Sequence, residues 1–242
     1  MKLLSVGDLH YNMPQFDWLM NSAGKYDLVI IAGDLLNIAG HVDLDTQILV
    51  INKYLARLRE RTTLFVCSGN HDGDRKGESG EYFADWLDTS ALGGIEGDGS
   101  SVQVGDWLFS LCPWWDGPVG LQAVTSFLEA EAAKAVKNWF IVHHAPPSES
   151  RIAWSGKRDF GDEHLRSFIL KHSPRIVLSG HVHQAPFRDE GGWYDRIGDT
   201  WVFNAGYQMA QLPPYLEFNL GDSEVSWCSL EGIERITLNR SL

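Results

Sequence analysis

The stretch Thr63-Leu64-Phe65-Val66-Cys67-Ser68-Gly69-Asn70-His71-Asp72 joins a run of apolar residues to a polar turn. A short apolar run of this kind is typical of a buried strand, so we expect a strand over residues 63–67. The amide oxygen of Asn70 can bind a divalent cation, and the imidazole of His71 can give a proton to a group that the cation activates. Gly-Asn-His-Asp is also the composition of an ordinary turn, so its meaning depends on the rest of the chain.

The same arrangement, an apolar run followed by Asp or His, recurs at four other places. Apolar residues at helical spacing lie between several of these runs, and strands that alternate with helices predict an α/β fold with a parallel sheet. The carboxyl ends of parallel strands meet at one edge of a sheet, so we expect the polar loops to lie together there. The further expected strands cover residues 3–6, 28–32, 139–142 and 175–179, and the helices residues 16–23, 48–58 and 165–172.

Other parts of the sequence predict antiparallel strands and two more helices. Gly105-Asp106, Gly198-Asp199 and Gly221-Asp222 each separate apolar runs, as the turns of hairpins do. Residues 121–136 are rich in Ala and Glu and predict a helix, and residues 82–87 predict a short one. The expected later strands cover residues 200–203, 215–220 and 224–229.

Length and composition favour a single acidic domain. The chain has 242 residues without a linker or repeat, so we expect one domain over residues 1–242. The net charge of -12 repels nucleic acid and anionic membranes, which makes nucleic acid an unlikely partner. The three cysteines are odd in number and lie in apolar surroundings, as reduced thiols in the cytoplasm do. No segment approaches the ~20 apolar residues of a membrane span, and the first apolar run is too short for a signal peptide.

The polar loops hold an unusual concentration of metal ligands. Carboxylate, amide and imidazole groups without thiolate favour Mn, Fe, Zn or Co over a structural zinc of the cysteine type. The set is too large for one ion. Two ions about 3.5–4 Å apart with a shared carboxylate would use all of these groups and would hold the attacking and leaving oxygens of a displacement at phosphorus. The candidates are Asp8, His10, Asp34, Asn70, His71, His143, His144, His181 and His183.

Five blocks follow one another in a fixed order, namely Asp8-Leu9-His10, Gly33-Asp34, Gly69-Asn70-His71-Asp72, His143-His144 and Gly180-His181-Val182-His183. In this order the sequence resembles the calcineurin-like metallophosphoesterase superfamily. The resemblance implies an α/β fold, a four-layer αββα sandwich of two mixed β-sheets flanked by helices, with a dinuclear site. It also implies that one ion is held by Asp8, His10 and His183, the other by Asn70, His144 and His181, and that Asp34 bridges them.

Three points stay open at this stage. His143 lies directly at a strand end, whereas His144 fits the His-x-Pro spacing of many family members. We assign His144 as the ligand, and His143 as a residue that either supports the ligands from behind or faces the substrate. Arg151, in the long loop that follows, either pairs with substrate phosphate or is simply solvated. Trp114 and Trp115 either line the pocket or only pack in the core.

The ligand set predicts a phosphoesterase that uses two divalent ions (Mn, Fe or Zn) to hydrolyse a small-molecule phosphomonoester or phosphodiester. Water or hydroxide held between two ions attacks phosphorus near neutral pH, and His71 as general acid protonates the leaving oxygen. The alternatives are a nuclease or protein phosphatase of the same superfamily, and a noncatalytic scaffold with this fold. Every ligand position is filled, which favours an enzyme over a scaffold.

Overall fold

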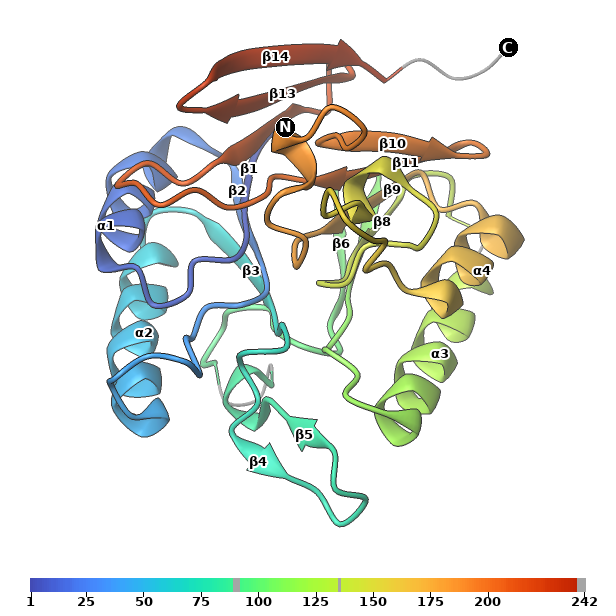
Figure 1. The fold of residues 1–242 in the computed structure, drawn as a ribbon. Coiled ribbons are helices and arrows are strands. Elements are labelled where there is room, and N and C mark those ends of the chain that lie inside the picture. The colour runs from blue at the N-terminus through green and yellow to red at the C-terminus, as the bar shows by residue number, and fades with distance from the viewer. Residues whose placement is uncertain (89–91, 135, 239–242) are drawn as a thin grey trace.

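Two six-stranded sheets form the centre of the computed structural model, which describes residues 1–88, 92–134 and 136–238 (Figure 1). The first sheet has the order β14-β13-β12-β1-β2-β3, and the second the order β10-β11-β9-β8-β7-β6. The first sheet consists of β1 (Lys2–Val6), β2 (Leu28–Ala32), β3 (Thr63–Cys67), β12 (Tyr215–Asn219), β13 (Glu224–Ser229) and β14 (Gly232–Thr237). The second consists of β6 (Ser101–Val104), β7 (Trp107–Leu111), β8 (Trp139–Val142), β9 (Ile176–Ser179), β10 (Tyr194–Ile197) and β11 (Thr200–Asn204).

Both sheets are mixed. Strands β1, β2 and β3 run parallel, whereas β12, β13 and β14 continue the first sheet with antiparallel neighbours. In the second sheet β7, β8, β9 and β11 are parallel, and the two edge strands β6 and β10 are antiparallel to their neighbours. The predicted parallel crossovers and the predicted hairpins are thus both present.

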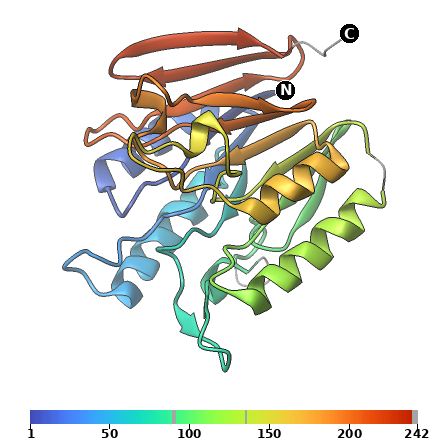
Figure 2. The same ribbon diagram turned by 45° about the vertical axis from the view of Figure 1, so that its right-hand side comes forward.

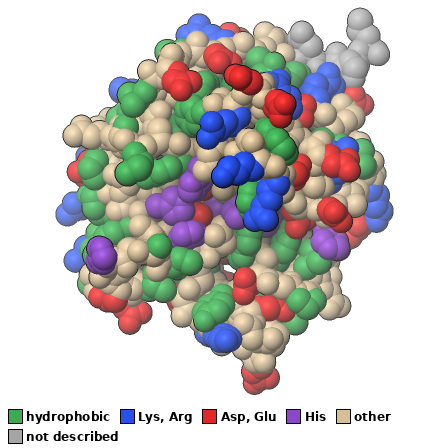
Figure 3. Space-filling model, viewed as in Figure 1, with side chains coloured by type: hydrophobic (Ala, Val, Ile, Leu, Met, Phe, Trp, Pro, Cys, Tyr) green, Lys and Arg blue, Asp and Glu red, His purple; other side chains and the backbone are tan. Residues whose placement is uncertain are grey.

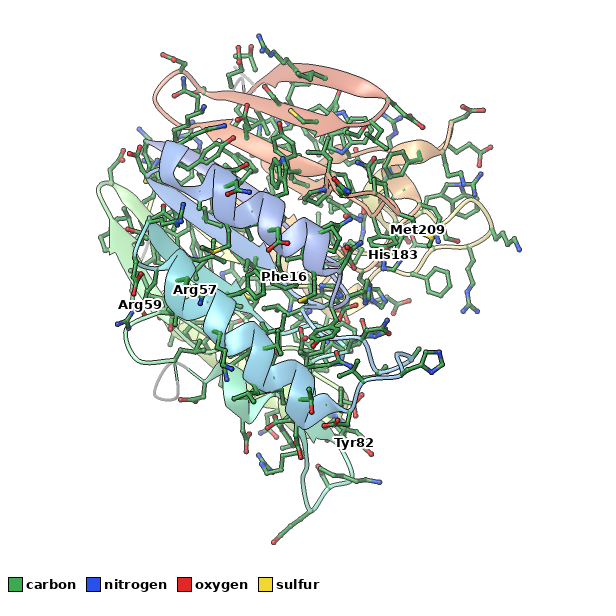
Figure 4. All side chains as sticks on the ribbon, turned by 90° about the vertical axis from the view of Figure 1, so that its left-hand side faces the viewer. Phe16, Arg57, Arg59, Tyr82, His183 and Met209 are labelled. Atoms are coloured by element: carbon green, nitrogen blue, oxygen red, sulfur yellow. The ribbon has the colours of Figure 1, made fainter. Side chains whose placement is uncertain are left out.

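Helices cover the outer face of each sheet. Helices α1 (Met13–Ser22) and α2 (Leu44–Leu58) lie on the first sheet, and α3 (Pro118–Ala132) and α4 (Glu163–His172) lie side by side on the second (Figures 1 and 2). Phe16 of α1 is fully buried in this layer, and Figure 4 shows it between α1 and α2. None of the helices in the described ranges has both the length and the apolarity that crossing a membrane requires.

Alternation along the strands divides the core into layers. Leu28 and Ile30 of β2 pack between the two sheets, whereas Val29 and Ile31 of the same strand pack under α1 and α2. A third cluster lies between the second sheet and α3 and α4. These layers confirm the four-layer αββα sandwich, and the single-domain interpretation stays a prediction.

We expect Phe140→Ala to destabilise the fold strongly. Phe140 is fully buried between the sheets, where its ring lies 5.0 Å from that of Phe109 and 5.6 Å from that of Phe218. Truncation of such a side chain leaves a cavity and costs about 3–5 kcal/mol of unfolding free energy, which urea denaturation measures. Leu170→Ala, at a position on α4 that is 59% exposed, serves as control, and equal losses in the two variants would contradict the assigned core.

Two local predictions are wrong. Residues 82–87 do not form one helix: β5 (Tyr82–Phe83) pairs with β4 (Arg75–Lys76), and a 3-10 turn, η2 (Asp85–Leu87), follows. The helix predicted over residues 121–136 begins earlier, at Pro118, where the fixed φ of proline suits the first turn, and it ends at Ala132. Residue 135 of that prediction lies outside the described residues. Among the described residues, the remaining 3-10 turns are η1 (Ala23–Lys25), η3 (Arg151–Ala153) and η4 (Ala185–Phe187).

Candidate metal centre

The loops after β1 and β2 bring two buried carboxylates to the same edge of the first sheet. Asp8 and Asp34 are each 1% exposed, and both have positive φ, near 54°. The two loops are joined by backbone hydrogen bonds from Asp8 N to the Gly33 carbonyl (3.0 Å) and from His10 N to the Asp34 carbonyl (2.9 Å). His10 and His181 also have left-handed backbones. Strain of this kind gathers at functional sites, because the surrounding structure must enforce it.

Glycines allow these loops to approach each other closely. A Cβ atom on Gly33, where φ is +88°, would lie 2.6 Å from Cγ of His144, and one on Gly180 would lie 2.6 Å from Oδ2 of Asp8. A Cβ atom on Gly69 would lie 2.8 Å from Cδ2 of His144. Real Cβ atoms avoid such distances, so only glycine fits beside these acidic and imidazole side chains.

We expect Gly33→Ala to displace His144 and to lose activity and bound metal together. The substitution combines an overlap with the imidazole and an unfavourable φ, so it should also destabilise the protein by more than about 1 kcal/mol. Metal analysis and thermal unfolding measure both effects. Gly24→Ala is a matched control, since an added Cβ there meets nothing within 4 Å. Normal metal content in Gly33→Ala would show that the close packing is not required.

One group of side chains converges around Asp8. Its Oδ1 lies 3.1 Å from Nε2 of His183, which in turn lies 3.0 Å from Nε2 of His10. Nε2 of His10 is 3.7 Å from Oδ2 of Asp34. The potential ligand atoms of Asp8, His10, Asp34 and His183 all lie within 4.8 Å of one another, as the ligands of a single ion do.

A second group lies on the other side of Asp34. Nε2 of His144 is 3.2 Å from Oδ2 of Asp34, and Nδ1 of His181 is 2.8 Å from the amide oxygen of Asn70. Nδ1 of His144 donates to the Ala32 carbonyl at 2.7 Å, which directs Nε2 toward the carboxylates. A metal-binding histidine is commonly held by such a bond from its other nitrogen.

The donor atoms fit divalent cations. Nε2 of His144 is fully buried, and it lies 3.2 Å from Oδ2 of Asp34 and 3.8 Å from Oδ1 of Asp8. A buried imidazole nitrogen aimed at two carboxylates is what a cation would satisfy. Asp34 faces both groups, and Oδ1 of Asp8 also lies 3.8 Å from Nε2 of His144, so the structure brings the seven predicted ligands together. They are Asp8, His10, Asp34, Asn70, His144, His181 and His183.

Charge is balanced within the centre. Burial alone would raise the pKa of Asp34, but the neighbouring His144 and His10 outweigh it and hold the pKa well below its usual range. For His144, burial favours the neutral ring, yet Asp34 and Asp8 raise its pKa to about 10. Burial lowers the pKa of His181 to about 4, so this imidazole is neutral and available as a ligand.

His71 lies at the edge of the same centre. Its backbone N–H donates to Oδ1 of Asp34 at 2.8 Å, and its ring lies 4.6 Å from that of His10. Nδ1 of His71 has no hydrogen-bond partner among the described residues. The side chain therefore lies beside His10, at the edge of the ligand cluster.

The structure does not bring the two predicted substrate-binding residues into the ligand cluster. His143 is fully buried with its ring stacked on Trp115, centroids 3.7 Å apart, and burial lowers its pKa to about 3. Arg151 is exposed, and its guanidinium donates to the Gly191 carbonyl at 2.5 Å. Their contact with substrate stays a prediction.

Two further residues hold the ligands in place. Asp72 is fully buried and accepts hydrogen bonds from the N–H groups of Leu36 (2.9 Å) and Gly69 (2.8 Å), which joins the loops after β2 and β3. Burial, with Asp34 nearby, raises its pKa to about 8. The ring of Tyr207 lies 5.0 Å from that of His183. Asp72 stands in one of the five sequence blocks but is not among the candidate ligands, and Tyr207 stands in none of the blocks.

Comparison with known proteins identifies the family. The family model for calcineurin-like phosphoesterases matches residues 1–185, which include every predicted ligand. The chain belongs to the calcineurin-like phosphoesterase family. A search of the curated proteins found no match.

Solved structures show how widely the fold of this calcineurin-like phosphoesterase is shared. A dimetal phosphatase from Danio rerio is similar with a TM-score of 0.63 at 11% identity, with coverage of 100% of this chain and 99% of that one. The protein TT1561 of Thermus thermophilus is similar with a TM-score of 0.60 at 13% identity, and the match covers 98% of this chain and 99% of that one. The purple acid phosphatase PPD1 of yellow lupin (Lupinus luteus) is similar with a TM-score of 0.59 at 13% identity, and the match covers 98% of this chain and 51% of that one.

Proposed function

We propose that this calcineurin-like phosphoesterase uses two divalent ions to hydrolyse a phosphomonoester or phosphodiester of a small molecule. The observation that carries the proposal is the position of Asp34, whose Oδ2 lies 3.7 Å from Nε2 of His10 and 3.2 Å from Nε2 of His144. One carboxylate between two sets of ligands is the arrangement that a dinuclear centre needs. A dimetal phosphatase shares the fold, in agreement with this proposal.

The proposed ligands fall into two sets. Asp8, His10 and His183 hold one ion, Asn70, His144 and His181 hold the other, and Asp34 contributes to both. When bound, Mn, Fe or Zn supplies positive charge for the phosphoryl oxygens and lowers the pKa of water.

The chain's own side chains complete the chemistry. In the protonated form, His71 gives its proton to the oxygen of the departing alcohol, and the bond from its backbone N–H to Asp34 fixes its distance from the ligands. Asp72 keeps the loop of His71 against the loop of Asp34 through its bonds to Gly69 and Leu36. The acidic net charge of -12 favours a small-molecule partner over nucleic acid.

Activity and metal content test the proposal directly. We expect protein loaded with manganese to bind two ions per chain and to hydrolyse p-nitrophenyl phosphate or bis(p-nitrophenyl) phosphate, and a chelator to abolish turnover. Two bound ions without turnover of either ester would favour a noncatalytic scaffold. Failure to take up metal would overturn the proposal.

A further inference from the structure

A pocket of ≈ 350 Å³ lies next to the second group of ligands. This is at the small end of the range of about 300–1,000 Å³ that ligand pockets occupy, so it suits one ring system. Three separate segments form it: the chain from the loop after β2 to the first residue of α2, the chain from the loop after β3 to the residue after β5, and the segment before α3. The lining residues are Ile38, Leu44, Gly69, Asn70, Gly73, Tyr82, Ala84, Trp114 and Asp116.

Hydrogen bonds fix the wall that Tyr82 forms. Tyr82 N–H donates to Oδ2 of Asp116 at 2.9 Å. The neighbouring Glu81 is buried, and its two carboxylate oxygens accept the N–H groups of Val119 (2.9 Å) and Gly120 (2.8 Å) at the start of α3. The β4–β5 hairpin is thus attached to the second layer of helices and holds Tyr82 in position.

Trp114 connects the pocket to the ligands. Its backbone N–H donates to the hydroxyl oxygen of Ser68 at 2.8 Å, and its ring lies 5.4 Å from that of His181 and 5.9 Å from that of His144. One wall of the pocket is therefore the same indole that packs against two proposed ligands. A ligand in the pocket lies directly beside the metal centre.

The chemistry of the lining is apolar, aromatic and partly acidic. Ile38 is 55% exposed and Tyr82 is 48% exposed, so both present apolar surface to solvent. Among the described residues that line the pocket there is no Lys, Arg or His, and the one charged side chain is the carboxylate of Asp116. Figure 3 shows Lys and Arg side chains on one side of the central histidines, but none belongs to this lining. Nζ of Lys76 lies 5.6 Å from the ring centroid of Tyr82 but does not belong to the lining, so a second anionic group inside the pocket would meet the carboxylate of Asp116.

We infer that this pocket binds the leaving alcohol of the substrate and selects an uncharged aromatic group. The inference rests on the proposed phosphoesterase function. Asn70 lines the pocket and its amide oxygen lies 2.8 Å from Nδ1 of His181, so an organic group joined to a phosphate at the metal centre can reach this wall. Trp114 and Tyr82 then offer faces for a flat ring, and Asp116 accepts a hydrogen bond from a hydroxyl or amino group on it.

A matched pair of esters tests the selectivity. Phenyl phosphate and 3-carboxyphenyl phosphate release phenols of nearly the same acidity, so their rates differ mainly through the pocket. With the manganese-loaded enzyme we expect kcat/KM to favour phenyl phosphate by about tenfold, because the added carboxylate of the other ester would face the carboxylate of Asp116 in the pocket. Asp116→Asn keeps an oxygen that accepts the Tyr82 N–H. It should lower the ratio of the two kcat/KM values about fivefold, because the negative charge is removed.

A second variant removes apolar surface without touching a ligand. Ile38→Ala should raise KM for phenyl phosphate about threefold to tenfold with kcat nearly unchanged, since it removes contact rather than chemistry. Ile233→Ala, on the exposed strand β14, is the matched control and should change nothing. Equal kcat/KM for the two esters, or an unchanged KM in Ile38→Ala, would overturn the pocket assignment. Turnover of the esters in these experiments would still support the phosphoesterase proposal.

Binding measured without turnover separates the two proposals. Calorimetry with phenylphosphonate and 3-carboxyphenylphosphonate should give the same preference and the same dependence on Ile38 and Asp116. Preferential binding of phenylphosphonate by a protein that hydrolyses no ester would overturn the proposed hydrolysis and support the pocket. Equal binding of both phosphonates would overturn the pocket whether or not esters are hydrolysed.

Discussion

Asp34→Asn should abolish most metal binding and lower kcat/KM for phosphate esters by at least about 1,000-fold. Asp34 contacts both ligand groups, because its Oδ2 lies 3.7 Å from Nε2 of His10 and 3.2 Å from Nε2 of His144. An amide keeps the shape of the side chain but removes the negative charge that two cations would share. Metal analysis by mass spectrometry and steady-state kinetics measure the two losses.

Asp45→Asn is the matched control, because Asp45 lies in the exposed first turn of α2 and makes the same change of charge. It should bind metal and turn over ester as the unmodified protein does. Two tightly held ions in Asp34→Asn would remove the case for a bridging carboxylate.

His71→Ala should retain both ions and lose rate in proportion to the basicity of the leaving group. A general acid contributes about 10²–10⁴-fold, and the contribution is largest for alkoxides, which depart poorly without a proton. Alkyl phosphates should therefore lose most activity, whereas p-nitrophenyl phosphate, with its stable anion, should lose far less. A series of esters with graded leaving groups measures this dependence.

His41→Ala provides the comparison, since His41 is an exposed loop residue outside the centre. A His71→Ala variant that slows good and poor leaving groups equally would contradict proton donation and would point to a role in positioning. Loss of metal in His71→Ala would also contradict the role of His71 as a proton donor alone, because the side chain would then be needed to keep the ions bound.

Sequence alone predicts the strands that carry the ligands because each is a continuous apolar run, buried on both faces. The run over residues 28–32 became β2, whose side chains alternate between the two core layers. Strand β14 was not predicted. Its sequence Gly-Ile-Glu-Arg-Ile-Thr is largely exposed and is a strand because it pairs with β13, a contact that composition does not reveal.

The candidate site also has parts that the sequence predicts and parts that only the structure shows. The ligand residues stand in recognisable blocks, and the structure brings the blocks together. The pairing of Asp72 with Leu36 and the stacking of His143 on Trp115 join segments that are 36 and 28 residues apart, and no local pattern predicts such contacts. The pocket beside Asn70 likewise combines three segments, so only the folded chain shows its lining.

The proposed ligands come from loops of two different sheets, with Asp8, Asp34 and Asn70 on one side and His144 and His181 on the other. Ions bound there would act as cross-links between the two halves of the sandwich, and separation of the halves would release them. Apparent stability should then rise with the logarithm of the free metal concentration, by mass action. Metal supply would thus govern how long the folded protein persists as well as how fast it works.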